Sequence, residues 1–195
     1  MHQDELTAVL NRRGFRQACE LHSAPNALRG LCCVMIDLDD FKRINDQCGH
    51  PVGDAVLARL AHALQRRLRP HDVVARLGGD EFALLLLDAT AEEAARILAR
   101  VQQDLERHPE EWEYTPTALR FSAGIAERVV CETLLECLAR ADHALLDAKR
   151  MGKGRLARAR PPEARTTDGA MPSTLSSTEF LPAMSKIPSA GHAEP

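Results

Sequence analysis

Two acidic residues, Asp80 and Glu81, directly follow a pair of glycines in the run RLGGDEF (residues 76–82). The flanking segments, residues 73–77 and 82–87, are apolar and typical of strands. Because glycine adopts backbone conformations closed to other residues, the pair predicts a hairpin turn with both carboxylates at its tip. Taken alone, the segment also fits a simple solvated acidic turn.

A second acidic cluster, formed by Asp37, Asp39 and Asp40, stands at the end of the apolar run at residues 31–36. An acid at the carboxyl end of a buried strand lies at the edge of the sheet, where neighbouring strands can place their own. Carboxylate oxygens are the ligands that hard cations prefer. The two clusters together predict a hard-cation site, although Asp37 alone would also fit a helix-capping acid.

Further motifs surround these acids in a fixed order. They are Asp4-x-Leu6-Thr7 with Leu10-Asn11-Arg12-Arg13, then Asp37-x-Asp39-x-Phe41-Lys42-x-x-Asn45-Asp46, Gly49-His50-x-x-Gly53-Asp54, Gly78 to Phe82, and Ala148-Lys149. From about residue 4 to 156, these five motifs resemble the GGDEF family of diguanylate cyclases. The departures from the family pattern are Ala8 for a glycine, Leu146 for a tyrosine, and Gly152-Lys153-Gly154-Arg155 for Gly-Arg-Asn-Arg.

The resemblance implies a nucleotidyltransferase that condenses two GTP molecules into the second messenger cyclic di-GMP and two pyrophosphates. The 3′-hydroxyl of one GTP attacks the α-phosphate of the other, and divalent ions lower the hydroxyl pKa and neutralise the developing charge. The implied ion is Mg²⁺, with Mn²⁺ as an alternative. The implied metal ligands are Asp37, the carbonyl of Leu38, Asp80 and Glu81. Which hairpin acid activates the hydroxyl stays open, and Glu81 is expected to be essential.

The resemblance also implies how guanine would be read, through Asn45 and Asp54. The Asn45 amide can donate and accept, while the Asp54 carboxylate can accept from the N1–H and N2–H groups of guanine. Taken singly, Asn45 resembles a helix-end residue and Asp54 an N-cap. At the family's positions they predict a pocket that discriminates against adenine.

Phosphates would be met by the turn after the first strand, which includes Asp39, Asp40 and Phe41 and whose N–H groups open a helix, and by Lys42. Lys149, and less securely Lys153, would reach the β- and γ-phosphates from the C-terminal end of the domain. For each lysine, a solvated surface charge is the simpler alternative.

Arg69-Pro70-His71-Asp72 resembles the family's RxxD motif for product inhibition by cyclic di-GMP. An arginine can bind a phosphate or guanine bidentately, and an aspartate can accept from guanine N–H groups. A helix-terminating arginine and a loop aspartate would look the same in sequence. Arg100 is a further implied product contact across a dimer.

Each monomer of such an enzyme holds one GTP, so the resemblance implies a homodimer with two facing active sites. The chain begins at the first motif, and without an upstream domain to bring two copies together we expect it to cycle slowly. A non-catalytic receptor for GTP or cyclic di-GMP is the main alternative, disfavoured by the intact Asp80 and Glu81. A cyclase for another base is disfavoured by Asp54.

The composition fits one globular domain with a tail. The chain has 195 residues, of which 45% are hydrophobic, and a net charge of -3, so nothing marks it as a nucleic-acid-binding polycation. No stretch approaches the ~20 apolar residues of a membrane span, and no signal peptide opens the chain. Six cysteines without CxxC spacing predict reduced thiols and a cytoplasmic protein.

The elements that must position these residues follow from hydrophobic periodicity. Helices are expected at residues 6–21, 41–47, 54–68, 91–107 and 134–149, and strands at 31–38, 73–77, 82–87, 119–126 and near 155. The order βαββαβ with additions predicts an α/β (α+β) fold of the ferredoxin-like or polymerase-palm type, with helices packed on one sheet. Residues 1–160 would form this domain, and residues 161–195, rich in Pro, Ser, Thr and Ala, a disordered tail.

Overall fold

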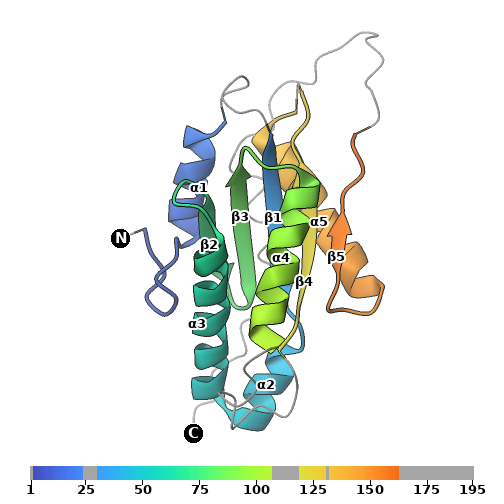
Figure 1. The fold of residues 1–195 in the computed structure, drawn as a ribbon. Helices are drawn as coiled ribbons and strands as arrows, with labels where there is room; N and C mark the ends of the chain where they lie inside the picture. Colours follow the sequence, from blue (N-terminus) through green and yellow to red (C-terminus); the bar gives the residue numbers. More distant parts are fainter. Residues whose placement is uncertain (1, 24–29, 107–118, 131, 163–195) are drawn as a thin grey trace, which may run out of the picture. The chain divides into compact units, whose positions relative to one another are not determined.

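Five strands form one mixed sheet in the order β2-β3-β1-β4-β5 (Figure 1). The computed structural model describes residues 2–23, 30–106, 119–130 and 132–162. The strands are β1 (Leu31–Leu38), β2 (Val73–Gly78), β3 (Glu81–Leu87), β4 (Phe121–Glu127) and β5 (Leu156–Arg158). Neighbouring strands are antiparallel except for β4 and β5, which are parallel. This is the predicted ferredoxin-like, palm arrangement with one added edge strand.

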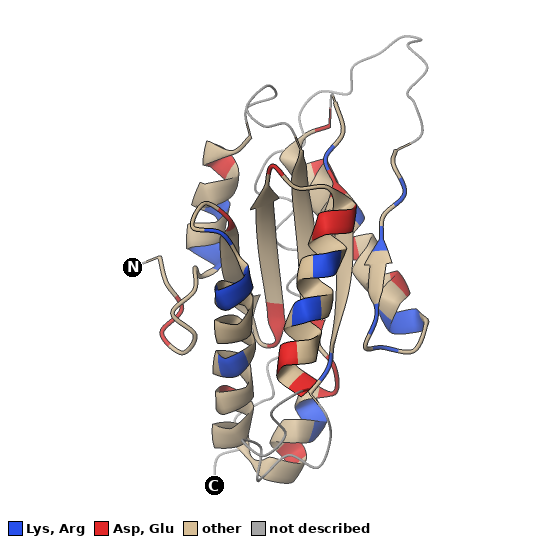
Figure 2. Ribbon diagram, in the orientation of Figure 1, with Lys and Arg blue, Asp and Glu red and all other residues tan. Residues whose placement is uncertain are grey.

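The described residues form five helices. They are α1 (Arg12–Leu21), α2 (Phe41–Cys48), α3 (His50–Arg67), α4 (Ala91–Glu106) and α5 (Leu134–Arg150). In Figure 1, α3 and α4 lie in front of the sheet, while α1 and α5 lie behind it. Figure 2 shows Lys or Arg positions along α3 and α4, and an Asp or Glu position at the start of β3.

Alternation along β1 decides which side chains enter which layer. Cys32, Val34, Ile36 and Leu38 belong to the core cluster that α3 and α4 complete. Because successive strand residues point to opposite faces, the residues between them, including Asp37, point toward the layer of α1 and α5. The strand therefore places Asp37 on the same side of the sheet as α5.

The first helix begins at Arg12, so the helix expected from residue 6 was predicted too long. The Asp4 carboxylate accepts hydrogen bonds from both the backbone N–H and the hydroxyl of Thr7, which ties this segment into a turn. Ala8 has a φ of 58°, which a helix does not allow. Asn11 is the N-cap of this helix, and its side chain accepts a hydrogen bond from the N–H of Gly14 at 3.0 Å.

The third helix begins at His50, four residues before the expected start at Asp54. Gly49, with a φ of 85°, separates it from α2, and Pro51 in the first turn needs no intrahelical hydrogen bond for its nitrogen. The other elements lie within about two residues of their expected bounds, as boundaries usually do. Residue 107, the expected end of α4, and residues 163–195 of the expected tail lie outside the described residues.

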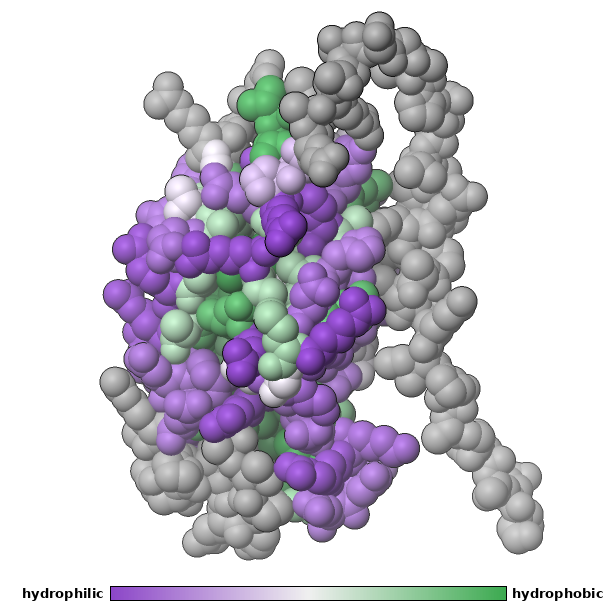
Figure 3. Space-filling view, turned by 90° about the vertical axis from the view of Figure 1, so that its right-hand side faces the viewer, coloured by the Kyte–Doolittle hydropathy of each residue, from purple (hydrophilic) through white to green (hydrophobic). Residues whose placement is uncertain are grey.

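The described cysteines are free thiols, and most are buried. Burial raises the pKa of Cys19 and of Cys32 to about 12, so neither is a reactive thiolate at neutral pH. On one face of the molecule, hydrophilic residues surround a smaller group of apolar ones (Figure 3). No helix in the described ranges is both long and apolar enough to cross a bilayer.

Candidate active site

The two glycines of the acidic turn adopt the conformations for which glycine is suited. Gly78 has a φ of 148° and Gly79 a φ of 53°. A side chain at Gly79 would meet no heavy atom within 4 Å, so the need for glycine there comes from the backbone dihedral and not from crowding. The pairing of β2 with β3 shifts register between Arg76 and Gly78, and Glu81 begins the returning strand. The hairpin is therefore confirmed.

Asp37 and Glu81 occupy directly opposite positions on β1 and β3. Side chains at such positions share one face of the sheet, with Cβ atoms ~4.5–5.5 Å apart. The neighbouring backbone is joined as well, because the N–H of Leu38 donates to the carbonyl of Asp80 at 3.3 Å. The sheet thus brings together the acidic clusters that lie more than forty residues apart in the chain.

Burial raises the pKa of the Asp37, Asp80 and Glu81 carboxyls. Repulsion adds to this effect, since the negative charges of Asp37 and Asp80 raise the pKa of Glu81 further. Like charges directly opposite one another on a sheet are destabilising. A positive group placed among these carboxylates would relieve both effects.

One such positive group is the ammonium of Lys149, near the end of α5. Its Nζ lies 2.7 Å from Oδ2 of Asp37, whose side chain is only 14% exposed. Lys149 lowers the pKa of Asp37, but the burial of the carboxylate outweighs it. The motif at residues 148–149 therefore lies next to the acids, although 112 positions separate Lys149 from Asp37 in the chain.

The donor set fits a divalent cation that shares its coordination with a substrate. Among the described residues, no three His, Cys, Asp or Glu side chains are grouped closely enough to hold an ion by themselves. The acids therefore converge less completely than the sequence led us to expect. Mg²⁺ is usually bound through one or two carboxylates together with substrate phosphates, so facing carboxylates at Asp37 and Glu81 suit it.

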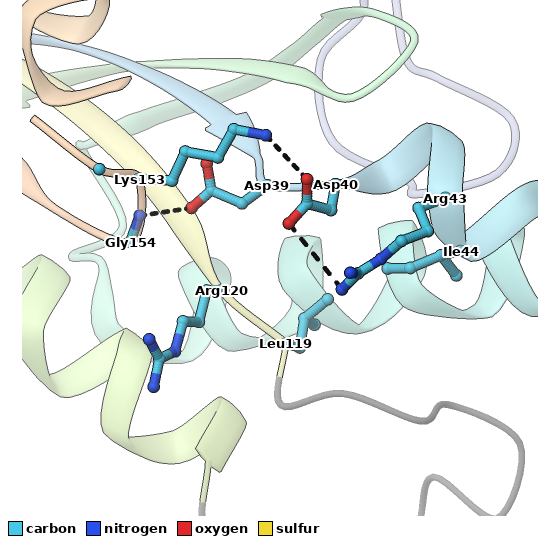
Figure 4. A pocket seen from close by; sticks show the side chains of 9 residues that line it. Asp39, Asp40, Arg43, Ile44, Leu119, Arg120, Lys153 and Gly154 are labelled. Atoms are coloured by element: carbon cyan, nitrogen blue, oxygen red, sulfur yellow. Dashed lines mark hydrogen bonds and ion pairs between the residues drawn. The ribbon is translucent and has the colours of Figure 1, made fainter. Parts of the chain in front are cut away.

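The turn after β1 carries two further acids with different environments. Asp40 has a φ of 58°, and its Oδ1 lies 2.7 Å from Nζ of Lys153, with Arg43 on its other side at 3.9 Å. Asp39 is buried and bonds to other parts of the chain. These residues line an open pocket of ≈ 380 Å³, in which Lys153 reaches across to Asp40 (Figure 4). Lys42, on α2, is exposed.

Asn45 and Asp54 occupy the interiors of α2 and α3, so neither is the helix-end or N-cap residue that it resembles when taken singly. The Oδ1 of Asn45 is buried and has no hydrogen-bond partner in the described part of the chain. A side chain at Gly53 would collide with this oxygen and lie 3.3 Å from the Phe41 ring. Gly53 therefore gives Asn45 its space, and an unpaired acceptor remains for a donor such as a guanine N–H.

Arg69 and Asp72 lie at the opposite end of β2 from the acidic turn. A six-residue strand spans ~20 Å, so the RxxD motif is not part of the acidic site. The Asp72 carboxylate accepts from the N–H groups of Arg69 at 2.9 Å and Leu87 at 3.0 Å, which ties the loop to the end of β3. The Arg69 side chain is exposed, as is that of Arg100 on α4.

The family model described as "Diguanylate cyclase, GGDEF domain" matches residues 1–155, about four fifths of the chain. The chain belongs to the GGDEF family. All the acids, lysines and guanine-pocket residues described above lie within this match.

Relatives of the GGDEF domain agree with this assignment. The probable diguanylate cyclase DgcT of Escherichia coli is 33% identical over 80% of the chain and 35% of that protein. The diguanylate cyclase DgcP of Pseudomonas aeruginosa is 37% identical over 78% of the chain and 23% of its own length. The crystal structure of the coiled coil and GGDEF domain of DgcB from Caulobacter crescentus, in complex with c-di-GMP, matches with a TM-score of 0.72 at 30% identity, covering 81% of this chain and 85% of that one. The chain spans about a third or less of the two curated relatives.

Sequence reasoning did not identify the residues that brace the acidic turn of this GGDEF domain. The Arg76 guanidinium donates to the carbonyl of Gly79 at 2.9 Å and to the Asp4 carboxylate at 3.2 Å. Arg12 donates to the carbonyl of Leu77 at 2.9 Å. Asp4 and Arg12 lie in the motifs named above, and Arg76 lies in the run at residues 76–82. Their spacing in the sequence does not predict these hydrogen bonds. The segment before α1 therefore supports the hairpin that carries the acids.

Proposed function

We propose that this GGDEF domain is a diguanylate cyclase that condenses two GTP molecules into cyclic di-GMP and two pyrophosphates. The observation that carries the proposal is the opposed pair of Asp37 and Glu81, with the Lys149 ammonium beside them. Facing carboxylates with raised pKa values and an adjacent lysine suit a cation bound to a triphosphate. The names of the relatives DgcT and DgcP as diguanylate cyclases support the same reaction.

In this proposal Asp37, the carbonyl of Leu38, Asp80 and Glu81 hold Mg²⁺ or Mn²⁺. When bound, such an ion would lower the pKa of the attacking hydroxyl and neutralise charge on the phosphates. A carboxylate with a raised pKa is also a better acceptor for the proton of the 3′-hydroxyl, and Glu81 is our candidate for that task.

Lys149, Lys153 and Lys42 would bind the triphosphate, with the N–H groups at the start of α2, including that of Phe41. Asn45 and Asp54 would read the base: the free Oδ1 of Asn45 can accept one guanine N–H, and Asp54 offers further acceptors. Adenine lacks the N1–H and N2–H donors, so the same pocket would leave these acceptors unpaired.

Each protomer would hold one GTP, and a cytoplasmic homodimer would bring the two nucleotides face to face. Product inhibition would use Arg69 and Asp72, with Arg100 as a further contact. Because Asp72 already accepts two backbone hydrogen bonds, the exposed Arg69 guanidinium would supply most of the new contacts.

The test is incubation of the purified protein with GTP and Mg²⁺ at high protein concentration, with products resolved by mass spectrometry. We expect cyclic di-GMP from the wild type and none from Glu81→Gln, while Glu5→Gln, which changes an exposed acid, retains synthesis. Absence of product from the wild type, together with tight binding of GTP or cyclic di-GMP, would identify a receptor instead.

Two variants test the finer assignments. Asp54→Ser should reduce the preference for GTP over ATP, and an unaltered preference would exclude our guanine pocket. Arg69→Ala should weaken cyclic di-GMP binding without lowering the initial rate, whereas unchanged binding would exclude the inhibitory site. Calorimetry measures the second effect directly.

A further inference from the structure

Asp39 is a buried carboxylate for which the proposed reaction gives no role. It is 8% exposed, and each of its two oxygens already has a partner from a different part of the chain. Oδ1 accepts from the hydroxyl of Ser122 on β4 at 2.8 Å, and Oδ2 accepts from the N–H of Gly154 at 2.7 Å (Figure 4). A buried charge is costly unless it is hydrogen-bonded, so these two contacts are what keep it in place.

Gly154 belongs to a turn in which one residue, Lys153, has an unfavourable backbone conformation. Gly152, Lys153 and Gly154 have φ values of 113°, 58° and 59°, so three successive residues are left-handed and one of them is a lysine. Such conformations persist when the surrounding structure holds them. All three residues are exposed, which leaves little packing to hold them. The hydrogen bond from Gly154 to Asp39 is a buried anchor of this turn to the end of β1.

The same turn contains Lys153 and lies just after Lys149, and both lysines would bind phosphate in the proposed reaction. Lys149 lies in the last turn of α5, and its carbonyl accepts from the N–H of Gly152 at 3.2 Å. Lys153 lies at the centre of the turn, and its Nζ contacts Asp40, the neighbour of Asp39. Whatever fixes the turn therefore also fixes where the Lys153 ammonium lies relative to the turn after β1, whereas Lys149 is held by α5 and by its ion pair with Asp37.

We propose that Asp39 is a positioning residue: its carboxylate anchors the turn at residues 152–154 to β1 and so places Lys153 for the triphosphate of bound GTP. This inference rests on the proposed function. Asp39 is largely buried and each of its oxygens accepts a hydrogen bond within the protein, so the role proposed for it acts through the turn and not by contact with the substrate. Its neighbour Asp37, with its side chain paired to Lys149, faces the reacting groups.

Three substitutions distinguish the effect of the hydrogen bond to Gly154 from that of the negative charge of Asp39 and from a general loss of stability. Asp39→Ala removes both hydrogen bonds. Asp39→Asn removes the charge but keeps the shape, because its amide can accept from the N–H of Gly154 and donate to the Ser122 hydroxyl. Ser122→Ala is the matched control: it deletes a buried hydrogen bond to the same carboxylate but leaves the one to Gly154.

Binding is measured by calorimetry with Mg²⁺ and either 3′-deoxy-GTP, which lacks the attacking hydroxyl, or GMP, which lacks the β- and γ-phosphates. We expect Asp39→Ala to weaken 3′-deoxy-GTP about tenfold, the effect of losing one ordered charged contact, and GMP by less than about twofold. Asp39→Asn and Ser122→Ala should stay within about twofold of the wild type for both ligands. In a Lys153→Ala background, Asp39→Ala should have a much smaller effect, because the lysine it positions is gone.

Equal weakening of both nucleotides by Asp39→Ala would overturn the inference, because it would indicate a general structural role. Loss of binding in Asp39→Asn would overturn it as well, since the charge and not the anchor would then matter. If Asp39→Ala does not fold, Asp39→Ser, which keeps a polar group but only one oxygen, takes its place with the same expectations. Binding needs no turnover, so absent cyclic di-GMP synthesis would reject the proposed function alone, whereas an unchanged ratio of the two affinities would reject this inference alone.

Discussion

Glu81→Gln should stabilise the folded protein while it abolishes synthesis. The carboxylate lies directly opposite Asp37, and burial and repulsion raise its pKa. Opposed like charges on a sheet cost ~0.2–1 kcal/mol, and the 14% exposure of the Asp37 side chain leaves little water to screen them. We therefore expect a gain of about 1 kcal/mol, which raises the unfolding temperature of a domain of this size by about 2–4 °C.

The gain should depend on pH with a definite sign. The folded state raises the pKa of Glu81, so it binds more protons than the unfolded chain at pH values between the ordinary and the raised pKa. The stability of the wild type therefore falls as pH rises through that window. The advantage of Glu81→Gln should be complete at neutral pH and disappear below about pH 4, where the carboxyl is neutral in both states.

The assay is thermal unfolding followed by circular dichroism, in EDTA, at acid and neutral pH. Glu5→Gln serves as the control, because it removes the same charge from an exposed site. With saturating Mg²⁺ and 3′-deoxy-GTP, the wild type should have the higher unfolding temperature, since only the wild type is fully stabilised by binding both ligands. A lower unfolding temperature for Glu81→Gln in EDTA at neutral pH would refute the reasoning, as would an advantage independent of pH.

Three further substitutions test positions where the backbone or a close contact is decisive. Gly53→Ala should raise the KM for GTP by about tenfold, because its methyl group would displace the Asn45 amide, and steady-state kinetics measure this. Ala8→Gly should raise the free energy of unfolding in urea by about 0.5–1 kcal/mol, since it removes a side chain from a left-handed position; a loss would contradict this. Arg76→Ala should lower that free energy by about 1–3 kcal/mol and reduce kcat, because it frees the Gly79 carbonyl and the partly buried Asp4 carboxylate; unchanged kcat would show that the brace does not position the acids.

Much of the fold could be predicted because its signals are local. The apolar stripe of α3 and the continuous apolar run of β1 identify a helix and a buried strand, and two glycines identify the turn between β2 and β3. The start of α1 could not be found from periodicity. The bonds of the Asp4 side chain to Thr7 compete with the helix there, and Ala8 takes a conformation that its type does not suggest.

The candidate site was predictable to the extent that its residues carry chemistry by type. Asp37, Asp80 and Glu81 are acids at strand ends, and the sheet places Asp37 directly opposite Glu81. Their partners could not be predicted, because the contact of Lys149 with Asp37 depends on how α5 lies across the sheet. The same applies to the burial of Asp39, which has the sequence signature of a metal ligand and the surroundings of a structural anchor.

In the proposed cyclase, the ion pair between α5 and β1 would make nucleotide entry an exchange of partners. Before entry, the ammonium of Lys149 is the counterion of Asp37. A cation alone would have to displace that ammonium, and a triphosphate alone would meet the repulsion of the carboxylates. A cation and a triphosphate arriving together give each member of the old pair a new partner of the right sign, so the charge balance at this edge of the sheet is kept throughout. In the proposed enzyme, loading of the metal and of the nucleotide would thereby be a single, mutually dependent event.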